Sequence, residues 1–270
     1  MRIALLSPTS TSLYARATAT LLRDVEGIEL VGIVIRSIFS WPRFRAELRR
    51  DGPRLLRKIH QKLILGSRAY PEEDPATMGA FVRTIGLERG TLNEDARRWG
   101  IPVRTTPTHN HPRTEGFLRG LAPDLIVFTG GGLVRRTILE LAPGGVVNCH
   151  SGLLPHYRGM DVVEWALLEG TGSGVGLTTH IMDAGVDTGP ILLQHVEPIQ
   201  PGDSVARIRS RLEPHMVTLM VASVRGLQQG TVKPRPQLAT EGRQYFVMHP
   251  RLQMLAEGAL AQRQPHERRT

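Results

Sequence analysis

The chain has 270 residues, of which 40% are hydrophobic, 5% aromatic and 22% charged, and this composition excludes wholesale disorder. No apolar run approaches the roughly 18 residues that a membrane span needs, and the apolar stretch at residues 3–6 is too short for the core of a signal peptide. The single cysteine, Cys149, excludes an internal disulfide framework and a cysteine-based zinc site. We therefore expect a cytoplasmic protein with no membrane partner.

The formal net charge of +9 arises from 34 basic and 25 acidic residues, and most of it falls within residues 36–68, where ten basic residues face two acidic ones. Such a segment is typical of a protein with an anionic partner. Only three of the basic residues in the whole chain are lysine, a bias that codon composition alone can produce. We interpret the segment mainly as a solvated helical face, and nucleic acid stays open as an alternative partner.

Apolar runs and helical spacing predict strands that alternate with helices. The predicted strands are 3–6, 28–35, 102–105, 124–129, 146–150 and 244–248. The predicted helices are 12–24, 43–65 (broken near 52–53), 76–87, 93–99, 114–121, 134–141, 161–168 (capped by Asp161) and 204–227 (kinked at Pro214). This alternation predicts an α/β fold with a doubly wound, mainly parallel, Rossmann-like sheet. We expect a catalytic domain over 1–200 and, over 201–270, a C-terminal helix with a short extension whose polar tail frays.

Two polar residues end the strand at 146–150. Side chains alternate along a strand, so Asn148 and His150 project on one side and Cys149 on the other, into a packed layer. An amide can donate to a developing oxyanion, and an imidazole can donate or carry a proton. The pair therefore indicates acyl chemistry, although both residues could merely cap the strand and the following turn. We interpret Cys149 as a buried structural residue rather than a nucleophile.

A second polar group lies in residues 179–190, which we interpret as a loop. His180, Asp183 and Asp187 are interleaved with glycines that allow sharp turns. A carboxylate in such a loop can orient a histidine or act as a base, and an ordinary Asp/Gly turn is the alternative. Their spacing matches neither a calcium loop nor a helical zinc motif, so we expect no metal site.

Two further segments offer ligand contacts. Arg158 and its neighbour Tyr157 follow a turn punctuated by glycine and proline, and Arg158 could hold an anionic substrate group or pair with a surface carboxylate. The loop Gly130–Gly132 follows a strand but lacks the spacing of a phosphate-binding loop. Its bare backbone could instead bind a flat heterocycle.

Taken in order, these pieces resemble the formyltransferase family that uses 10-formyltetrahydrofolate, which includes glycinamide ribonucleotide and methionyl-tRNA formyltransferases. The matching text is PDLIV at 123–127, NCH at 148–150, LLPHYRG at 153–159, His180 and DAGVDTGPIL at 183–192. The resemblance covers roughly residues 120–195. The family often has Ser directly before Leu-Leu-Pro, a position that Gly152 occupies here.

The resemblance implies a catalytic core of Asn148, His150 and Asp187. Asn148 and His150 would stabilise the oxyanion when an amine attacks the formyl carbon, and Asp187 would orient His150 and help to move the proton through water. It also implies that the folate lies beside two loops. The residues expected to bind it are Gly130, Gly131, Gly132, Leu133, His180, Asp183, Ala184 and Gly185.

We expect the acceptor to be the amine or hydroxylamine of a small molecule, such as an amino sugar, an amino acid derivative or glycinamide ribonucleotide, held partly by Tyr157 and Arg158. The roughly forty residues after Gly230 are too few for the C-terminal β-barrel of methionyl-tRNA formyltransferases. Transfer to aminoacyl-tRNA is one alternative. A non-catalytic RNA- or phosphate-binding protein on the same scaffold is the other, and the oligomeric state is open, with a homodimer as one option.

Overall fold

The structure is a computed structural model that describes residues 1–37, 76–170, 174–238 and 240–262. The helix predicted at 43–65, the basic segment beyond Ser37 and the tail after Gln262 lie outside the described residues.

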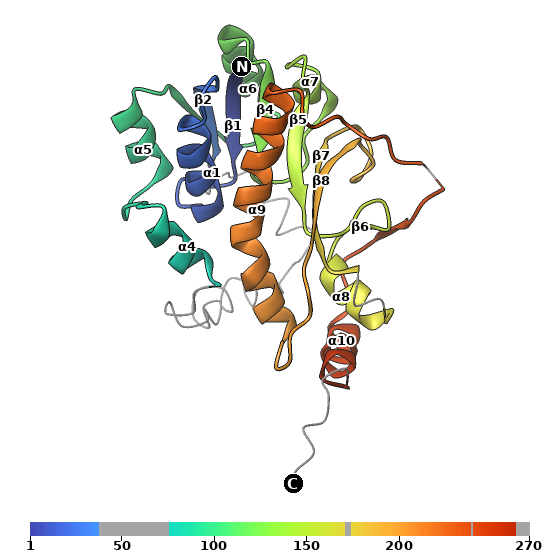
Figure 1. Ribbon diagram of the computed structural model, residues 1–270. Coiled ribbons are helices and arrows are strands. Elements are labelled where there is room, and N and C mark those ends of the chain that lie inside the picture. Colours follow the sequence, from blue (N-terminus) through green and yellow to red (C-terminus); the bar gives the residue numbers. More distant parts are fainter. Residues whose placement is uncertain (38–75, 171–173, 239, 263–270) are drawn as a thin grey trace, which may run out of the picture.

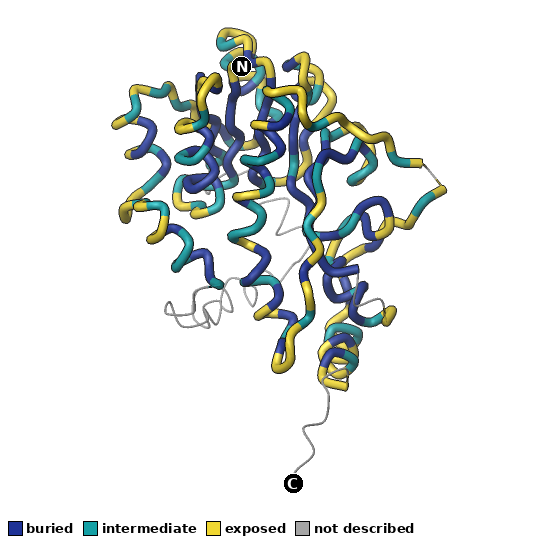
Figure 2. Tube along the Cα trace, in the orientation of Figure 1, coloured by how far each residue is buried: buried dark blue, intermediate teal, exposed yellow. Residues whose placement is uncertain are grey.

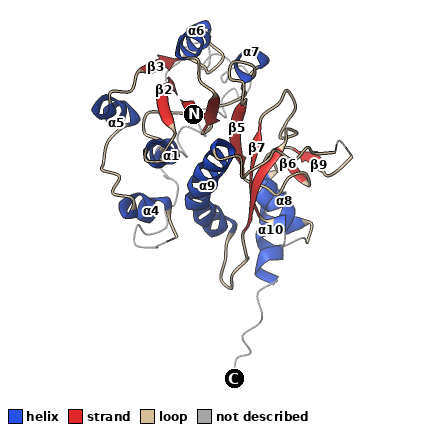
Figure 3. Cartoon of the chain, turned by 45° about the horizontal axis from the view of Figure 1, so that its top comes forward, coloured by secondary structure: helices blue, strands red, loops and turns tan. Residues whose placement is uncertain are grey.

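The described residues form a seven-stranded sheet with the strand order β3-β2-β1-β4-β5-β7-β8 (Figures 1 and 3). The first five strands in this order run parallel, and β7 pairs antiparallel with both β5 and β8. Their bounds are β1 (Arg2–Ser7), β2 (Glu29–Arg36), β3 (Val103–Thr106), β4 (Leu125–Phe128), β5 (Val146–His150), β7 (Gly176–Ile181) and β8 (Ile191–Val196). The predicted doubly wound, mainly parallel α/β fold is confirmed. The antiparallel hairpin is a correction, because residues 179–181, interpreted as loop, belong to β7.

Both faces of the sheet are buried, which explains why its strands read as continuous apolar runs (Figure 2). Ile3 and Leu5 of β1 belong to one core cluster, whereas Ala4 and Leu6 belong to a second. The same alternation continues in β4 and β5, since Val127, Val147 and Cys149 join the first cluster while Ile126, Phe128 and Val146 join the second. Each strand therefore supplies side chains to two separate helical layers.

The helices form these two layers (Figures 1 and 3). Helices α1 (Leu13–Arg23), α5 (Leu92–Trp99) and α9 (Val205–Gln228) supply buried residues to the first cluster, and α4 (Met78–Thr84) packs against α1 and α9. On the other face, α6 (Pro112–Leu121) and α7 (Arg136–Leu139) supply Leu118 and Ile138 to the second cluster. Among the described helices, none is long and apolar enough to cross a membrane.

Two helices are shorter than their sequence pattern. α4 ends at Thr84 rather than near 87, because Gly86 adopts a left-handed φ of +67° and breaks the helical path. α7 begins at Arg136 rather than at 134, because the Asn110 side chain accepts from the backbone N–H of Arg135 and holds the preceding residues as a loop.

The chain after α9 folds against the segment that follows β5. There β6 (Tyr157–Gly159) pairs in parallel with β9 (Arg243–Tyr245), and α10 (Pro250–Gln262) packs beside α8 (Val162–Leu168), as Figure 3 shows. Asp161 precedes α8 but makes no side-chain cap, which corrects the predicted role. Its Oδ2 accepts instead from the backbone N–H of Met248 and so holds the chain between β9 and α10.

Candidate active site

Asn148 and His150 project from β5 on the sheet face opposite α9. The cross-strand partner of Asn148 is His180 on β7, and that of His150 is Thr178. Cys149, between them, lies in the core on the α9 face, where burial raises the pKa of its thiol. A buried neutral thiol is a poor nucleophile, so the structure leaves the amide and imidazole as the reactive groups of this strand.

The loop between β7 and β8 brings Asp187 to these residues. Asp187 has a left-handed φ of +54°, a conformation that Asp tolerates better than most residues. Its Oδ2 lies 3.4 Å from His150 Nδ1, its Oδ1 lies 3.5 Å from His180 Nε2, and the backbone N–H of Gly159 donates to Oδ2 at 2.9 Å. Asp187, His150, His180 and Asn148, whose Nδ2 lies 3.2 Å from His180 Nε2, thus form one cluster.

The two nitrogens of His150 have different partners. Nε2 lies 2.7 Å from the backbone carbonyl of Tyr157 and must carry the hydrogen, because a carbonyl oxygen only accepts. Nδ1 faces Asp187. Burial lowers the pKa of His150, although the charge of Asp187 and the bond to Tyr157 act in the opposite direction. The neutral imidazole therefore presents a lone pair at Nδ1, beside a carboxylate that can stabilise it once protonated.

Asp187 is held as a carboxylate. Its burial alone would raise the pKa, but the hydrogen bond from His180, the charge of His150 and the Gly159 N–H outweigh it, and the net pKa is lowered. An ionised Asp187 beside a histidine with a lowered pKa is an arrangement suited to proton transfer near neutral pH.

The glycine loop lies at the switch point of the sheet, where the strand order turns from β1 to β4. Gly130, Gly131 and Gly132 have φ values of +108°, +120° and +99°. His109 Nε2 hydrogen-bonds the Gly130 carbonyl at 3.1 Å, and Arg36 donates to the Gly131 carbonyl at 2.6 Å. A Cβ at Gly131 would overlap the His109 ring, so this position requires glycine for space as well as conformation.

The same loop leaves donors available. Asn110 donates to the carbonyl of Leu133 at 2.8 Å, and the side chain of Leu133 is 83% exposed. Within the described residues, the backbone N–H groups of 130–133 donate no hydrogen bond. The loop therefore offers N–H groups and an exposed apolar side chain at the edge of the sheet where α/β proteins bind ligands.

Loop 182–190 is shaped by its own side chains and by Gln237, whose Nε2 donates to the carbonyls of Asp187 and Gly189. Asp183 accepts from the backbone N–H of Gly185 at 3.1 Å and from the Thr188 hydroxyl at 2.6 Å. Ala184 is exposed, and a Cβ at Gly189 would overlap the carbonyl of Ile181. Of the residues expected to bind folate in this segment, Asp183, Ala184 and Gly185 lie on this loop, whereas His180 lies on β7 in the cluster with Asp187, His150 and Asn148.

Tyr157 and Arg158 lie next to the cluster but are occupied by other contacts. The ring of Tyr157 stacks on Tyr245 at 5.5 Å and lines a cavity of about 490 Å³, together with Leu153, His156, Glu169, Gly174, Gly242, Arg243 and Tyr245. Arg158 is 7% exposed, and its guanidinium donates to the carbonyls of Leu238 and Glu241. Arg158 therefore binds main-chain carbonyls of the C-terminal extension, and not the surface carboxylate that the sequence offered as an alternative partner.

Sequence reasoning missed three residues that shape the site. His109 and Asn110, between β3 and α6, and Arg36, at the end of β2, hold the glycine loop from outside. The available signal was their position: each follows or ends a predicted parallel strand, and such ends meet at one edge of the sheet. The main-chain carbonyl of Tyr157, which fixes the His150 tautomer, has no signature in the sequence.

Residues 85–224 match the formyl transferase family. The chain is 36% identical over 152 residues to a methionyl-tRNA formyltransferase of Trichlorobacter lovleyi, a match that covers 56% of this chain and 48% of that protein. For the methionyl-tRNA formyltransferase of Desulfotalea psychrophila the identity is 38% over 146 residues, covering 53% and 44%. The chain thus spans about half the length of the curated relatives it matches.

Solved structures of similar fold cover more of the chain. Glycinamide ribonucleotide transformylase 1 from Symbiobacterium toebii has a TM-score of 0.55 and 23% identity, covering 90% of this chain and 92% of that one. A sugar N-formyltransferase from a Shewanella species has a TM-score of 0.56 and 12% identity, covering 96% and 87%. At these identities the likeness shows the fold.

Proposed function

This chain belongs to the formyl transferase family, and from that premise we propose that it moves the formyl group of 10-formyltetrahydrofolate to an amine of a small-molecule acceptor. The observation that carries the proposal is the cluster in which Asp187 lies 3.4 Å from His150 Nδ1, with Asn148 on the same strand face. An amide donor, a neutral imidazole and a carboxylate are the groups that acyl transfer between nitrogen atoms requires.

Asn148 supplies the donor for the oxyanion. When the acceptor amine attacks the formyl carbon, negative charge develops on the formyl oxygen, and a preorganised N–H stabilises it without reorganisation. His180 Nε2 lies 3.2 Å from Asn148 Nδ2, and this close packing limits the directions in which the Asn148 amide can point.

His150 and Asp187 manage the proton. The attacking amine must lose a proton as its bond to carbon forms, and the departing folate nitrogen must gain one. Nδ1 of His150 is the free position, since Nε2 is engaged by Tyr157. We assign to Nδ1 the acceptance and return of this proton through water, with Asp187 stabilising the transient imidazolium. This proposal replaces the oxyanion role expected for His150, because its one available nitrogen carries no hydrogen in the neutral state and cannot donate.

We place the folate beside the glycine loop. The backbone N–H groups of 130–133 would donate to the carbonyl and ring nitrogens of a pterin, and the exposed side chain of Leu133 would provide an apolar contact. Loop 182–190 brings Asp187 to the cluster and includes Asp183, Ala184 and Gly185. Their N–H and carbonyl groups are proposed to complete the folate site with His180.

A small acceptor is supported by the cavity that Tyr157 lines. Its volume of about 490 Å³ is of the size that holds small ligands, although Asn148, His150 and Asp187 are not among its lining residues. The described residues after Gly230 include β9 and α10, which pack on β6 and α8. Proteins of similar fold along most of this chain are named for glycinamide ribonucleotide and for sugars, which supports an acceptor of this class.

Transfer to aminoacyl-tRNA is the second candidate, because the relatives at 36–38% identity are methionyl-tRNA formyltransferases. Its test uses Arg49, Arg50, Arg54 and Arg57 of the basic segment, which lie outside the described residues. Submicromolar binding of tRNA that falls steeply with salt, and that is lost when these four are changed to Ala, would favour this candidate over a small acceptor.

Two measurements test the proposal. Calorimetry with 10-formyltetrahydrofolate or a stable 5-deaza analogue measures donor binding, and mass spectrometry of mixed amine pools incubated with enzyme and donor identifies the formylated product. We expect saturable folate binding and one acceptor class gaining a formyl group. No binding at millimolar folate would refute the donor and favour the non-catalytic RNA- or phosphate-binding alternative.

A further inference from the structure

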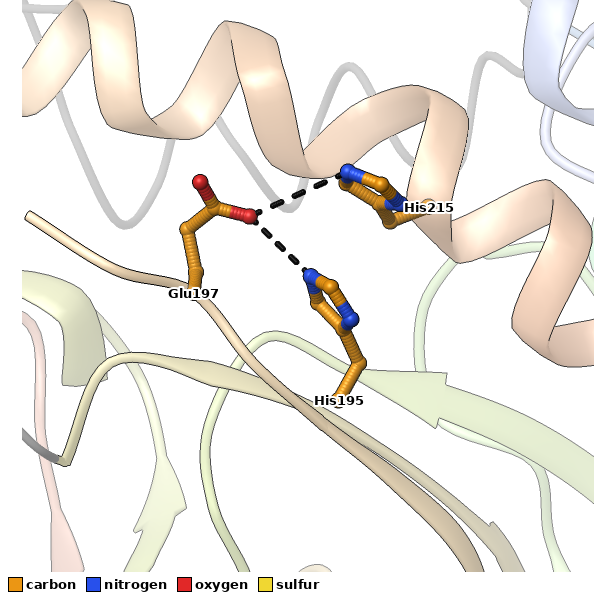
Figure 4. Close-up of side chains that lie close together, drawn as sticks. All are labelled: His195, Glu197 and His215. Atoms are coloured by element: carbon orange, nitrogen blue, oxygen red, sulfur yellow. Dashed lines mark hydrogen bonds and ion pairs between the residues drawn. The ribbon is translucent and has the colours of Figure 1, made fainter.

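A separate group of potential ligands lies on the other face of the sheet. His195 is on β8, Glu197 directly follows that strand, and His215 is on α9 (Figure 4). His195 pairs across the ladder with Leu177, which belongs to the core cluster shared with α9. Asn148 and His180 project from the opposite face, so this group is separate from the catalytic cluster.

The three side chains converge on one point. His195 Nε2 lies 3.0 Å and His215 Nε2 lies 3.9 Å from Glu197 Oε2, and the possible ligand atoms all lie within 4.8 Å of one another. The two imidazole rings stack with centroids 4.2 Å apart. Ligands at about 2.1 Å from a tetrahedral zinc ion are about 3.4 Å apart. Shifts of less than about 1.5 Å would therefore bring these atoms into a zinc coordination sphere.

Glu197 is fixed from behind. Arg211, one helical turn before His215 on α9, donates Nε to Glu197 Oε1 at 2.5 Å and also binds Asp203 through two hydrogen bonds of 2.7 and 2.9 Å. This leaves Oε2 directed at the two imidazoles. Metal ligands are commonly oriented by such outer hydrogen bonds, so the carboxylate already has the direction that a metal ligand needs.

Burial and access also suit a metal. The Glu197 side chain is 3% exposed, whereas those of His195 and His215 are 30% and 45% exposed. The carboxylate is therefore partly desolvated, and an ion can still enter from the imidazole side. Two imidazole nitrogens and one carboxylate oxygen favour zinc and neighbouring transition metals over magnesium or calcium, which take mainly oxygen ligands.

We propose that His195 Nε2, Glu197 Oε2 and His215 Nε2 form a site for a divalent transition metal of the zinc class, with water in the remaining position. A metal bound there ties β8 to α9 and stabilises the hairpin of β7 and β8, whose turn is loop 182–190. The site takes no part in formyl transfer, because its ligands lie on the α9 face of the sheet. This inference is independent of the proposed function and of the loop at 182–190, where no metal is expected.

The test uses the full chain after dialysis against a chelator. Titration with Co²⁺ should produce the intense visible absorption of a four-coordinate site, and Zn²⁺ should displace it with a one-to-one stoichiometry. Zn²⁺ at 100 times its Kd should raise Tm by about 5–10 °C. His215→Gln, at an exposed position, should weaken binding by about 10- to 100-fold or more, and His195→Gln/His215→Gln should abolish the Co²⁺ spectrum.

His249→Gln is the matched control, since His249 is exposed and lies outside the three-residue group. It should leave the spectrum, the Kd and the Tm shift unchanged. The proposal is overturned if Co²⁺ retains its six-coordinate aqueous spectrum, or if the double variant binds Zn²⁺ as tightly as the unchanged protein. A thermal melt of each variant without metal separates loss of binding from loss of folding.

Discussion

The loops that follow β4 and β7 are held in different ways. The carbonyls of loop 130–135 are held from outside, by Arg36, His109 and Asn110. Loop 182–190 is held partly by its own side chains, through the bonds of Asp183 to Gly185 and Thr188, and partly by Gln237, which donates to the carbonyls of Asp187 and Gly189. It carries Asp187 to His150. The first loop thus depends for its shape on a frame of three side chains from outside it, whereas the second also has internal hydrogen bonds and brings a charged group to the site. Substitutions in the frame of the first loop should therefore lower the free energy of unfolding, whereas substitution of Asp187 in the second loop should lower the reaction rate.

The largest effect should come from Asp187→Asn. Asn tolerates the left-handed backbone and can still accept from the Gly159 N–H, so the protein should fold normally. The lost charge removes the stabilisation of protonated His150, and the rate of formyl transfer should fall by about 10²- to 10⁴-fold. Single-turnover assays with thermal melts measure both, with the exposed Asp24→Asn as control. A folded variant within about fivefold of the unchanged rate would end this assignment.

Asn148→Ala tests a residue of β5 in the same assay. Loss of one oxyanion donor should lower the rate by about 10²- to 10³-fold. Folate affinity should change far less in both variants, since the lost interactions belong to the transition state. A parallel fall in affinity and rate would instead indicate that Asn148 binds the ground state.

His109, one of the residues that hold the first loop, should make the free energy of unfolding depend on pH. Burial, with the charge of Arg36, lowers the pKa of His109 to about 4 despite the bond to Gly130, against 6.5 in an unfolded chain. The unfolded state therefore binds more protons between these values, and the free energy of unfolding should drop by about 3 kcal/mol as the pH falls from 7 to 4. In His109→Gln this part of the loss should disappear. Urea unfolding of both proteins at several pH values measures this difference. The prediction is contradicted if the free energy of unfolding changes equally with pH in the two proteins.

Gly131→Ala should have a smaller effect, again on stability. Its φ of +120° and the overlap of a Cβ with His109 should cost about 1–3 kcal/mol. Gly120→Ala is a suitable control, because Gly120 lies in α6 with no atom within 4 Å of the added Cβ, and Ala is the better helix former. If the two variants unfold at the same denaturant concentration, the first loop does not depend on its frame.

The smallest effect is expected for Thr188→Ala in the second loop. It removes one partly exposed hydrogen bond to Asp183 and should cost about 1 kcal/mol or less. The rate should fall by less than about tenfold, provided that Asp187 keeps its place. A rate loss as large as that of Asp187→Asn would show that loop shape, rather than the carboxylate alone, limits the reaction.

The sequence predicts those parts of the molecule that depend on local pattern. Residues 147–150 alternate between apolar and polar, which places Asn148 and His150 on one face and Cys149 on the other, as observed. The strands β1, β2 and β4 follow from their apolar runs, because both faces of a parallel sheet are buried. Here local pattern and tertiary burial give the same answer.

Long-range contacts escape such reasoning. The pairing of His180 with Asn148 requires β7 to run antiparallel to β5, and no local signal in 176–181 distinguishes the two directions. The sequence suggests that Arg158 could bind an anion. In the structure its guanidinium donates to the carbonyls of Leu238 and Glu241, about eighty residues further along the chain. Asp161 reads as a helix cap, and it binds Met248 instead. In each case a distant backbone group decides the role.

The hairpin of β7 and β8 determines what covers the sheet face that bears Asn148. A last strand running parallel to β7 would need a crossover connection, usually a helix laid across the sheet. The antiparallel turn needs only residues 182–190, and these fold back along the face that bears Asn148. The surface that a crossover helix would have covered is occupied by a short loop, whose length and composition can vary without rebuilding the core. New acceptors could therefore be accommodated at this loop while the strands that hold Asn148 and His150 stay unchanged.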